Sequence, residues 1–150
     1  MRAVIQRVLG ASLSVDGATV SETGKGLVVY LGVGKGDDDT DIAYIVKKTA
    51  GLRIFEDDAG KMNRSARDVG AEILFVSQFT LYGDCRKGNR PSFTDAEPPE
   101  SAKALYERAT EALRAEGLTV RTGVFGADML IDQSCDGPVT IVLDLPPASA

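Results

Sequence analysis

Hydrophobic and polar residues alternate over residues 3–15, as they do in a β-strand that buries one face. The pair Asp16-Gly17 follows directly and is a typical two-residue hairpin turn, which predicts a return strand over residues 18–22. The next apolar run, at residues 26–34, is almost continuous. We therefore expect a buried third strand there.

Apolar residues recur at helical spacing in two later segments. Residues 41–52 show this spacing, and the acids of residues 36–40 before them favour a helix N-terminus. A second helix is predicted from Pro99 to the vicinity of Gly117, because glycine commonly ends a helix.

The remaining apolar runs predict further strands. They are a short strand with a turn at 53–63, a long central strand at 71–84, strands at 119–125 and 129–132, and a last strand at 139–145. Two main helices and about seven strands joined mostly by short turns are typical of an α+β domain with a largely antiparallel sheet. The chain has no repeat and no linker, so residues 1–150 are expected to form a single domain.

The chain contains no histidine, and this limits its chemistry. Serine–histidine and cysteine–histidine nucleophile pairs, imidazole bases and histidine-ligated metal sites are all excluded. The two cysteines, Cys85 and Cys135, lie far apart and outside any metal-binding spacing, so we expect free thiols and no metal site. Catalysis would rely on carboxylates, hydroxyls, thiols, backbone groups or the substrate itself.

The net charge of −5 does not indicate a nucleic-acid-binding domain, because such domains are typically basic. No apolar run approaches the roughly 20 residues that cross a bilayer. Residues 1–15 also lack the long apolar core of a signal peptide. We therefore expect a cytoplasmic protein with no membrane contact.

Polar residues interrupt the longest apolar run at Ser77-Gln78-Phe79-Thr80-Leu81. This segment fits a strand that turns from core to surface, or a strand end that gathers hydroxyl and backbone N–H groups at a site. Arg86, Lys87 and Arg90 follow it and form the one basic cluster of an acidic chain. They are typical of a solvated loop, with contacts to phosphate groups as the alternative.

Gly137 and Pro138 stand directly before the apolar run of the last strand. Proline cannot donate a backbone hydrogen bond, so the pair fits a turn that starts a strand, an edge or a bulge. The alternative is a cis peptide bond, which would redirect the neighbouring carbonyl groups while glycine let the backbone approach a ligand closely. A backbone carbonyl would be a fixed acceptor for an ammonium group.

Taken together, these segments resemble the D-aminoacyl-tRNA deacylase family, first described as D-tyrosyl-tRNA deacylases. The resemblance covers nearly the whole chain and includes AVIQRVLGASLSVDG, GLVVYLGVGKGD, RIFEDDAGKMN and, at residues 125–129, FGADM. The family's SQxxL motif is present as SQFTL at 77–81, RPSF follows at 90–93, and its NxGPVT motif is present as CDGPVT at 135–140. These last three motifs, in this order and spacing, are highly specific.

The resemblance implies the family's α+β fold with a barrel-like core, and a homodimer with active sites at the subunit interface. The enzyme would hydrolyse the ester that joins a D-amino acid, or glycine, to the 3′-terminal adenosine of tRNA. Gly137-Pro138 would be the family's Gly-cisPro pair, inserted into the partner's site. Its carbonyls would hold the substrate's α-ammonium and leave no room for an L side chain. The resemblance implies neither a cofactor nor a metal.

The resemblance also implies roles for particular residues. The catalytic residues would be Ser77, Gln78 and Thr80, and the substrate-binding residues Phe79, Leu81, Phe125, Gly137 and Pro138, with Arg86, Lys87 and Arg90 as candidates for tRNA phosphates. Thr80 would act as a hydroxyl nucleophile or through its backbone N–H at the oxyanion. We favour the backbone role, with the ribose 2′-hydroxyl assisting hydrolysis, because this fits the absence of histidine.

The chain departs from the family pattern at Cys135, where the motif has asparagine. A thiol is a poor hydrogen-bonding substitute, so the bracing of the Gly-Pro loop should differ, although Asp136 to Thr140 all match. Two other functions stay open. One is a non-catalytic dimer that binds the tRNA end, and the other is a thiol enzyme that uses Cys135, for which no base or cation is evident to lower the thiol pKa.

Overall fold

The computed structural model describes residues 1–146, which form three helices, one 3-10 turn and eight strands. The helices are α1 (Asp39–Gly51), α2 (Ala66–Val69) and α3 (Pro99–Ala115), and the 3-10 turn is η1 (Phe79–Tyr82). The strands are β1 (Arg2–Val15), β2 (Ala18–Thr23), β3 (Gly26–Gly32), β4 (Phe55–Glu56), β5 (Met62–Arg64), β6 (Glu72–Ser77), β7 (Thr119–Thr122) and β8 (Leu130–Asp144). Within these residues, no helix is long and apolar enough to cross a bilayer.

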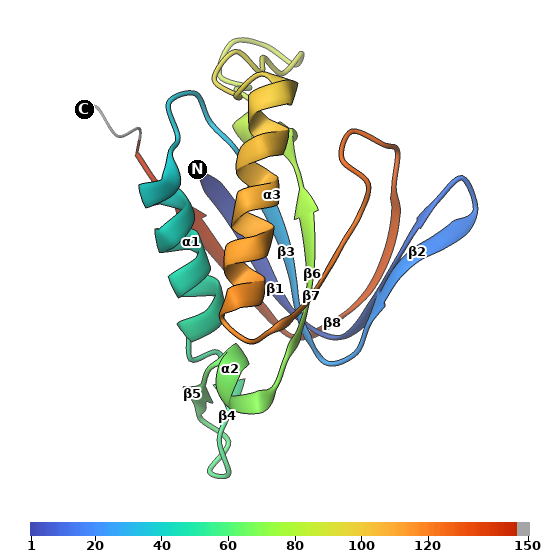
Figure 1. The fold of residues 1–150 in the computed structure, drawn as a ribbon, viewed down its shortest axis with the longest axis vertical. Helices are drawn as coiled ribbons and strands as arrows, with labels where there is room; N and C mark the ends of the chain where they lie inside the picture. The colour runs from blue at the N-terminus through green and yellow to red at the C-terminus, as the bar shows by residue number, and fades with distance from the viewer. Residues whose placement is uncertain (147–150) are drawn as a thin grey trace.

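Strand β1 organises the main sheet, because three other strands pair with it. Its first half pairs with β3, its second half with β2, and β8 follows it along both halves, always antiparallel. Beyond β3 the sheet continues in parallel through β6 and β7, which the sequence did not indicate. Crossovers that contain α1 and α3 precede these two strands, as parallel neighbours require (Figure 1).

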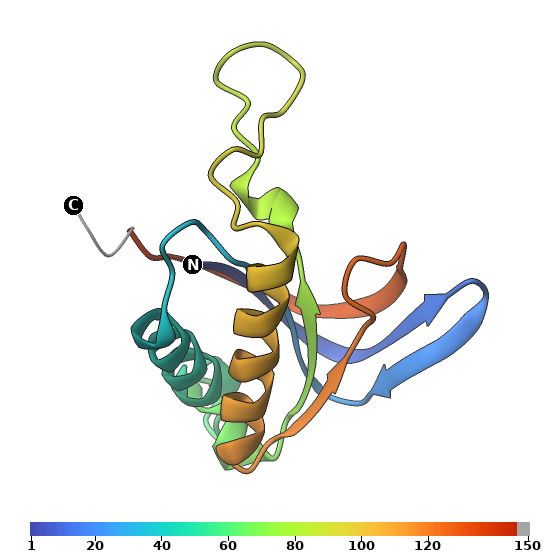
Figure 2. The same ribbon diagram turned by 45° about the horizontal axis from the view of Figure 1, so that its top comes forward.

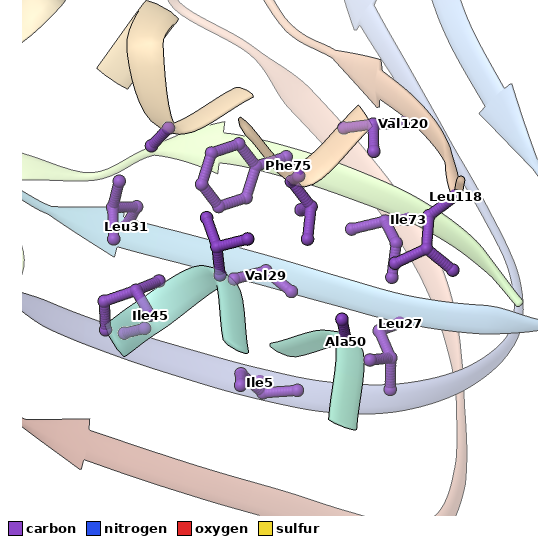
Figure 3. Close-up of a cluster of buried hydrophobic side chains, with 14 of the residues drawn as sticks. Ile5, Leu27, Val29, Leu31, Ile45, Ala50, Ile73, Phe75, Leu118 and Val120 are labelled. Carbon is purple, nitrogen blue, oxygen red and sulfur yellow. The ribbon is translucent and has the colours of Figure 1, made fainter. Parts of the chain in front are cut away.

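Helices α1 and α3 lie side by side and cover one face of the sheet (Figures 1 and 2). Alternate residues of the central strands, such as Val29 and Phe75, belong to the core on this side, together with Ile45 of α1 (Figure 3). The second half of β1 and the first half of β8 supply residues for a second core, in which Leu13 packs with Val28. The result is the expected α+β class with a barrel-like, largely antiparallel sheet.

Local sequence signals explain where the two long helices begin. The Asp38 side chain accepts a hydrogen bond from the N–H of Thr40 at 2.8 Å, and the Asp41 side chain accepts one from the N–H of Asp38 at 2.9 Å. This capping box starts α1 at Asp39, two residues before the predicted start. Helix α3 begins at Pro99 as predicted, because proline suits the first helical position.

Two strand predictions were wrong in their extent. The strand predicted over 71–84 ends at Ser77, because the N–H groups of Leu81 and Gly83 bond back to the carbonyls of residues 78 and 80 and form η1. The strands predicted at 129–132 and 139–145 are both parts of β8, because β1 is long enough to pair along all of it. The Gly-Pro pair therefore lies inside a strand and not in front of one.

Candidate active site

A cavity of about 610 Å³ opens between the end of β6, the loop that precedes α3 and the loop that joins β7 to β8. Three predicted site residues, Ser77, Gln78 and Phe79, line it from β6 and η1. Phe125 lines it from the β7–β8 loop, and Phe93 from the loop before α3. Segments far apart in the sequence thus meet at one concave and largely apolar site, the usual form of a small-ligand pocket.

An aromatic pair stands at this cavity. The ring centroids of Phe79 and Phe93 lie 5.1 Å apart in an edge-to-face arrangement, and Phe79 is 56% exposed. An exposed ring that a second ring holds in place can stack on a planar heterocycle. Phe93 was not among the predicted site residues, although its place in the RPSF motif was a signal for it.

Thr80 and Leu81 belong to η1 but do not line the cavity. The Thr80 hydroxyl accepts a hydrogen bond from the side-chain amide of Gln78, and within residues 1–146 no carboxylate contacts it. The backbone N–H groups of Phe79 and Thr80, at the start of η1, have no acceptor within the same range. The turn therefore offers backbone donors, but no base for the hydroxyl.

Arg2 holds η1 from the first strand. One guanidinium nitrogen donates to the carbonyl of Leu81 at 2.9 Å, and the guanidinium carbon lies 4.5 Å from the centroid of the Tyr82 ring. Its Nε also donates to the Asp144 carboxylate at 3.0 Å. Burial, followed by the charge of Asp37, raises the pKa of Tyr82, so this ring stays neutral beneath the guanidinium. Sequence reasoning missed Arg2, because nothing in the local pattern shows its contact with η1.

Gly137 and Pro138 lie in a bulge of β8. Gln6 of β1 is opposite Thr140 and Val8 is opposite Cys135, so residues 136–139 stand opposite a single residue of β1. The peptide bond between Gly137 and Pro138 is cis, and both residues are exposed. Neither residue lines the cavity of its own chain.

Arg7 is the single residue of β1 that faces this bulge, and its side chain is only 7% exposed. It donates to the carbonyl of Ile54 at 2.7 Å and, through Nε, to the carbonyl of Asp136 at 3.3 Å. The same Nε lies 3.2 Å from the Asp136 carboxylate. A buried, charged side chain thus ties the bulge to the core. Sequence reasoning missed it, although an arginine inside an alternating apolar strand was a visible signal.

The basic cluster lies in the loop between η1 and α3, which projects from the body of the molecule (Figure 2). Arg86 is engaged by Asp84, with contacts of 2.9 and 2.7 Å between the guanidinium and the carboxylate. These hydrogen bonds lower the pKa of Asp84 to about 2. Lys87 and Arg90 are exposed and make no ion pair within the described chain.

Few ionisable groups belong to the cavity. Within residues 1–146, those that line it are the carboxylates Glu97 and Asp128. Cys85 and Cys135 are free thiols, as predicted, and both are exposed. The same residues contain no group of three or more acidic or cysteine side chains that could hold a metal ion.

Comparison with known proteins gives consistent matches over the whole chain. A family model described as D-Tyr-tRNA(Tyr) deacylase matches residues 4–144. A Myxococcus xanthus (strain DK1622) protein named D-aminoacyl-tRNA deacylase is 59% identical over 150 residues, which are 100% of this chain and 98% of that protein. A solved structure described as c-Myc DNA unwinding element binding protein is 43% identical with a TM-score of 0.91, over 97% of this chain and 99% of the other. Another, described as a probable eukaryotic D-amino acid tRNA deacylase, shares the fold with a TM-score of 0.83 at 20% identity, over 96% of this chain and 98% of the other.

Proposed function

Because this chain belongs to the D-Tyr-tRNA(Tyr) deacylase family and is therefore a hydrolase, we propose that it cleaves the ester between a D-amino acid and the 3′-terminal adenosine of tRNA. The cavity carries this proposal, because Ser77, Gln78 and Phe79 of the family's SQxxL motif line it together with Phe125. The exposed Phe79 ring would stack on the adenine base. Glycyl-tRNA would be a second substrate, since glycine has no side chain for the site to reject.

Ester hydrolysis would use backbone donors and the substrate's own hydroxyl. The free N–H groups of Phe79 and Thr80 would stabilise the oxyanion that forms when water attacks the ester carbonyl. The 2′-hydroxyl of the ribose would assist the attack, because the chain has no histidine and no carboxylate contacts Thr80 within residues 1–146. Thr80 would thus act through its backbone, and Gln78 would fix its side chain.

The active enzyme would be a homodimer in which Gly137-Pro138 of one chain enters the cavity of the other. Two observations support this arrangement. The pair does not line the cavity of its own chain. Strand β8 pairs only with β1 in the described chain and exposes Val142 at 67% and Leu130 at 66%, an open edge that soluble proteins usually cover.

The Gly-Pro pair would act as the filter for chirality. Its carbonyl groups would accept hydrogen bonds from the α-ammonium, and its backbone would occupy the space that an L side chain needs. Gly137 suits this role for two reasons. Its φ of +127° is one that residues with a side chain rarely adopt, and it has no Cβ between the backbone and a ligand. The filter would reject an L substrate by contact, and it needs no group that titrates.

The tRNA would be held by its acceptor end, in the cytoplasm where charged tRNA is used. Lys87 and Arg90 are the stronger candidates for phosphate contacts, because Asp84 already engages Arg86. Replacing both with alanine should raise the KM and weaken its salt dependence, with little change in kcat. Arg108→Ala on α3, whose side chain pairs with Asp39, is a matched control that should leave the salt dependence unchanged.

Mixed dimers test the shared site directly. A Gly137→Ala chain would lack a correct filter, and a Phe79→Ala chain would lack a correct cavity. If the loop acts across the interface, mixing the two inactive variants restores one complete site in each mixed dimer. Recovery of about a quarter of the wild-type activity is expected from random pairing. No recovery, with mixed dimers present by mass spectrometry, would contradict action across the interface.

A further inference from the structure

Polar side chains from three strands form one continuous chain of hydrogen bonds. The Tyr30 hydroxyl donates to the side-chain oxygen of Gln133 at 2.7 Å. Gln133 Nε2 donates to Gln6 Oε1 at 2.7 Å and to Cys135 Sγ at 3.1 Å. Gln6 Nε2 then donates to Thr140 Oγ1 at 3.4 Å. Both amide hydrogens and the oxygen of Gln133 are therefore engaged.

This series of hydrogen bonds ends at Cys135 and Thr140, the two residues that flank the Gly-Pro bulge. Regular pairing of β8 with β1 stops at Cys135 and resumes at Thr140. Gln133 donates a hydrogen bond directly to Cys135, and it is connected to Thr140 through Gln6. The guanidinium of Arg7 holds the bulge itself from the core side. A loop fixed at both ends samples fewer conformations than a free one, so the network restricts where the bulge can stand.

We infer that Gln133 is a positioning residue for the Gly137-Pro138 loop and thereby sets the discrimination between D and L substrates. This inference rests on the function proposed above and extends it to a residue outside the cavity. Gln133 makes no hydrogen bond to Gly137 or Pro138 within the described residues, and it does not line the cavity, so its effect passes through Cys135 and Gln6. The contact with Cys135 is weak, because a thiol is a poor acceptor.

The variant Gln133→Met tests this role, because methionine has a similar length but neither donates nor accepts these hydrogen bonds. The ratio of kcat/KM for D- over L-tyrosyl-tRNA should fall about five- to tenfold, the change that corresponds to one net hydrogen bond. Asp132→Asn is the control, because Asp132 is an exposed neighbour on β8 outside the network. A ratio that falls equally in both variants, or in neither, overturns the inference.

Hydrogen exchange gives a readout that does not depend on activity. The backbone N–H groups of residues 135–137, 139 and 140 should exchange faster in Gln133→Met than in the wild type, while those of β6 keep their rates. Unchanged exchange in the loop overturns the positioning role, whatever the enzyme assay shows. If the wild type cleaves neither substrate but the loop exchange still rises, the positioning role stands and the proposed function is wrong.

A double-mutant cycle checks the route through the thiol. Cys135→Asn offers a stronger acceptor and should raise the D over L ratio when Gln133 is present. It should have no such effect together with Gln133→Met, because the donor is then gone. Equal effects in both backgrounds would show that Gln133 does not act through Cys135.

Discussion

The substitution Gly137→Ala should remove activity without unfolding the protein. Gly137 has a φ of +127°, and a Cβ there would stand 2.8 Å from the backbone nitrogen of Val139 and 2.9 Å from its Cγ2. A third neighbour, the guanidinium of Arg7, would lie 3.4 Å away. The first two distances are too short for a relaxed Cβ, so the loop has to move. The bulge lies on an open edge of the sheet, so it can shift while the core stays folded.

The size of the effect follows from this geometry. A side chain in such a backbone conformation costs about 1–3 kcal/mol. Because the loop can relieve part of that strain by moving, the loss of global stability should lie near the lower value. Catalysis is more sensitive, since a displacement of about 1 Å lowers rates about 100-fold. We therefore expect a loss of that order in kcat/KM for D-tyrosyl-tRNA.

Gly60→Ala is the matched control. Gly60 has a φ of +76°, but no atom lies within 4 Å of the position that a Cβ would take, and it stands in the turn between β4 and β5. It should lose a similar amount of stability by urea unfolding and keep full activity. Wild-type kcat/KM in Gly137→Ala, or an equal loss in Gly60→Ala, would refute the role of the loop in the reaction.

Three further predictions concern packing and pH. Gly26→Ala should lower the unfolding free energy by about 3 kcal/mol, because its Cβ would lie 1.8 Å from the Glu72 carbonyl oxygen, whereas Gly24→Ala, with its nearest atom at 3.9 Å, should cost far less. Burial raises the pKa of Tyr106 to about 12 in the folded protein. At pH values between the pKa of this tyrosine in the unfolded chain and about 12, only the unfolded chain ionises, so the unfolding free energy should fall by about 1.4 kcal/mol per pH unit. Tyr106→Phe should reduce that slope in alkaline urea titrations, and an unchanged slope would show that another group causes it. Finally, any inflection of kcat/KM between about pH 6 and about pH 8 should persist in every single side-chain variant, because the chain has no histidine. If the inflection disappeared in one variant, the replaced side chain would be a catalytic base.

The sequence predicted those parts of the fold that depend on local patterns. Alternation located β1, Asp16-Gly17 located the hairpin, and helical spacing with Pro99 located both long helices. It could not show that β3, β6 and β7 are parallel, because strand order depends on how the crossovers pack. It also divided β8 at the Gly-Pro pair, since proline inside a strand is recognisable only when the partner strand is known.

The same limit applies to the site. The structure brings the first three residues of the SQFTL segment to one cavity with Phe125, while the other two lie outside it. Two arginines, Arg2 at η1 and Arg7 at the bulge, contact residues far away in the sequence. The partners of these arginines cannot be found from local sequence, although an arginine at position 7, inside an alternating apolar strand, marks a buried charge. The same is true of Gln133, whose partners lie on three strands.

The most direct test of this account compares hydrolysis of matched D- and L-tyrosyl-tRNA by the wild-type protein. The assay follows loss of the labelled amino acid from tRNA, at equal concentrations and with an enzyme-free control for spontaneous hydrolysis. We expect rapid loss of the D form, while the L form decays at a rate only slightly above that of the control. Rapid loss of both would show that the Gly-Pro loop is no filter, and loss of neither by a folded dimer would indicate a protein that binds the tRNA end without cleaving it.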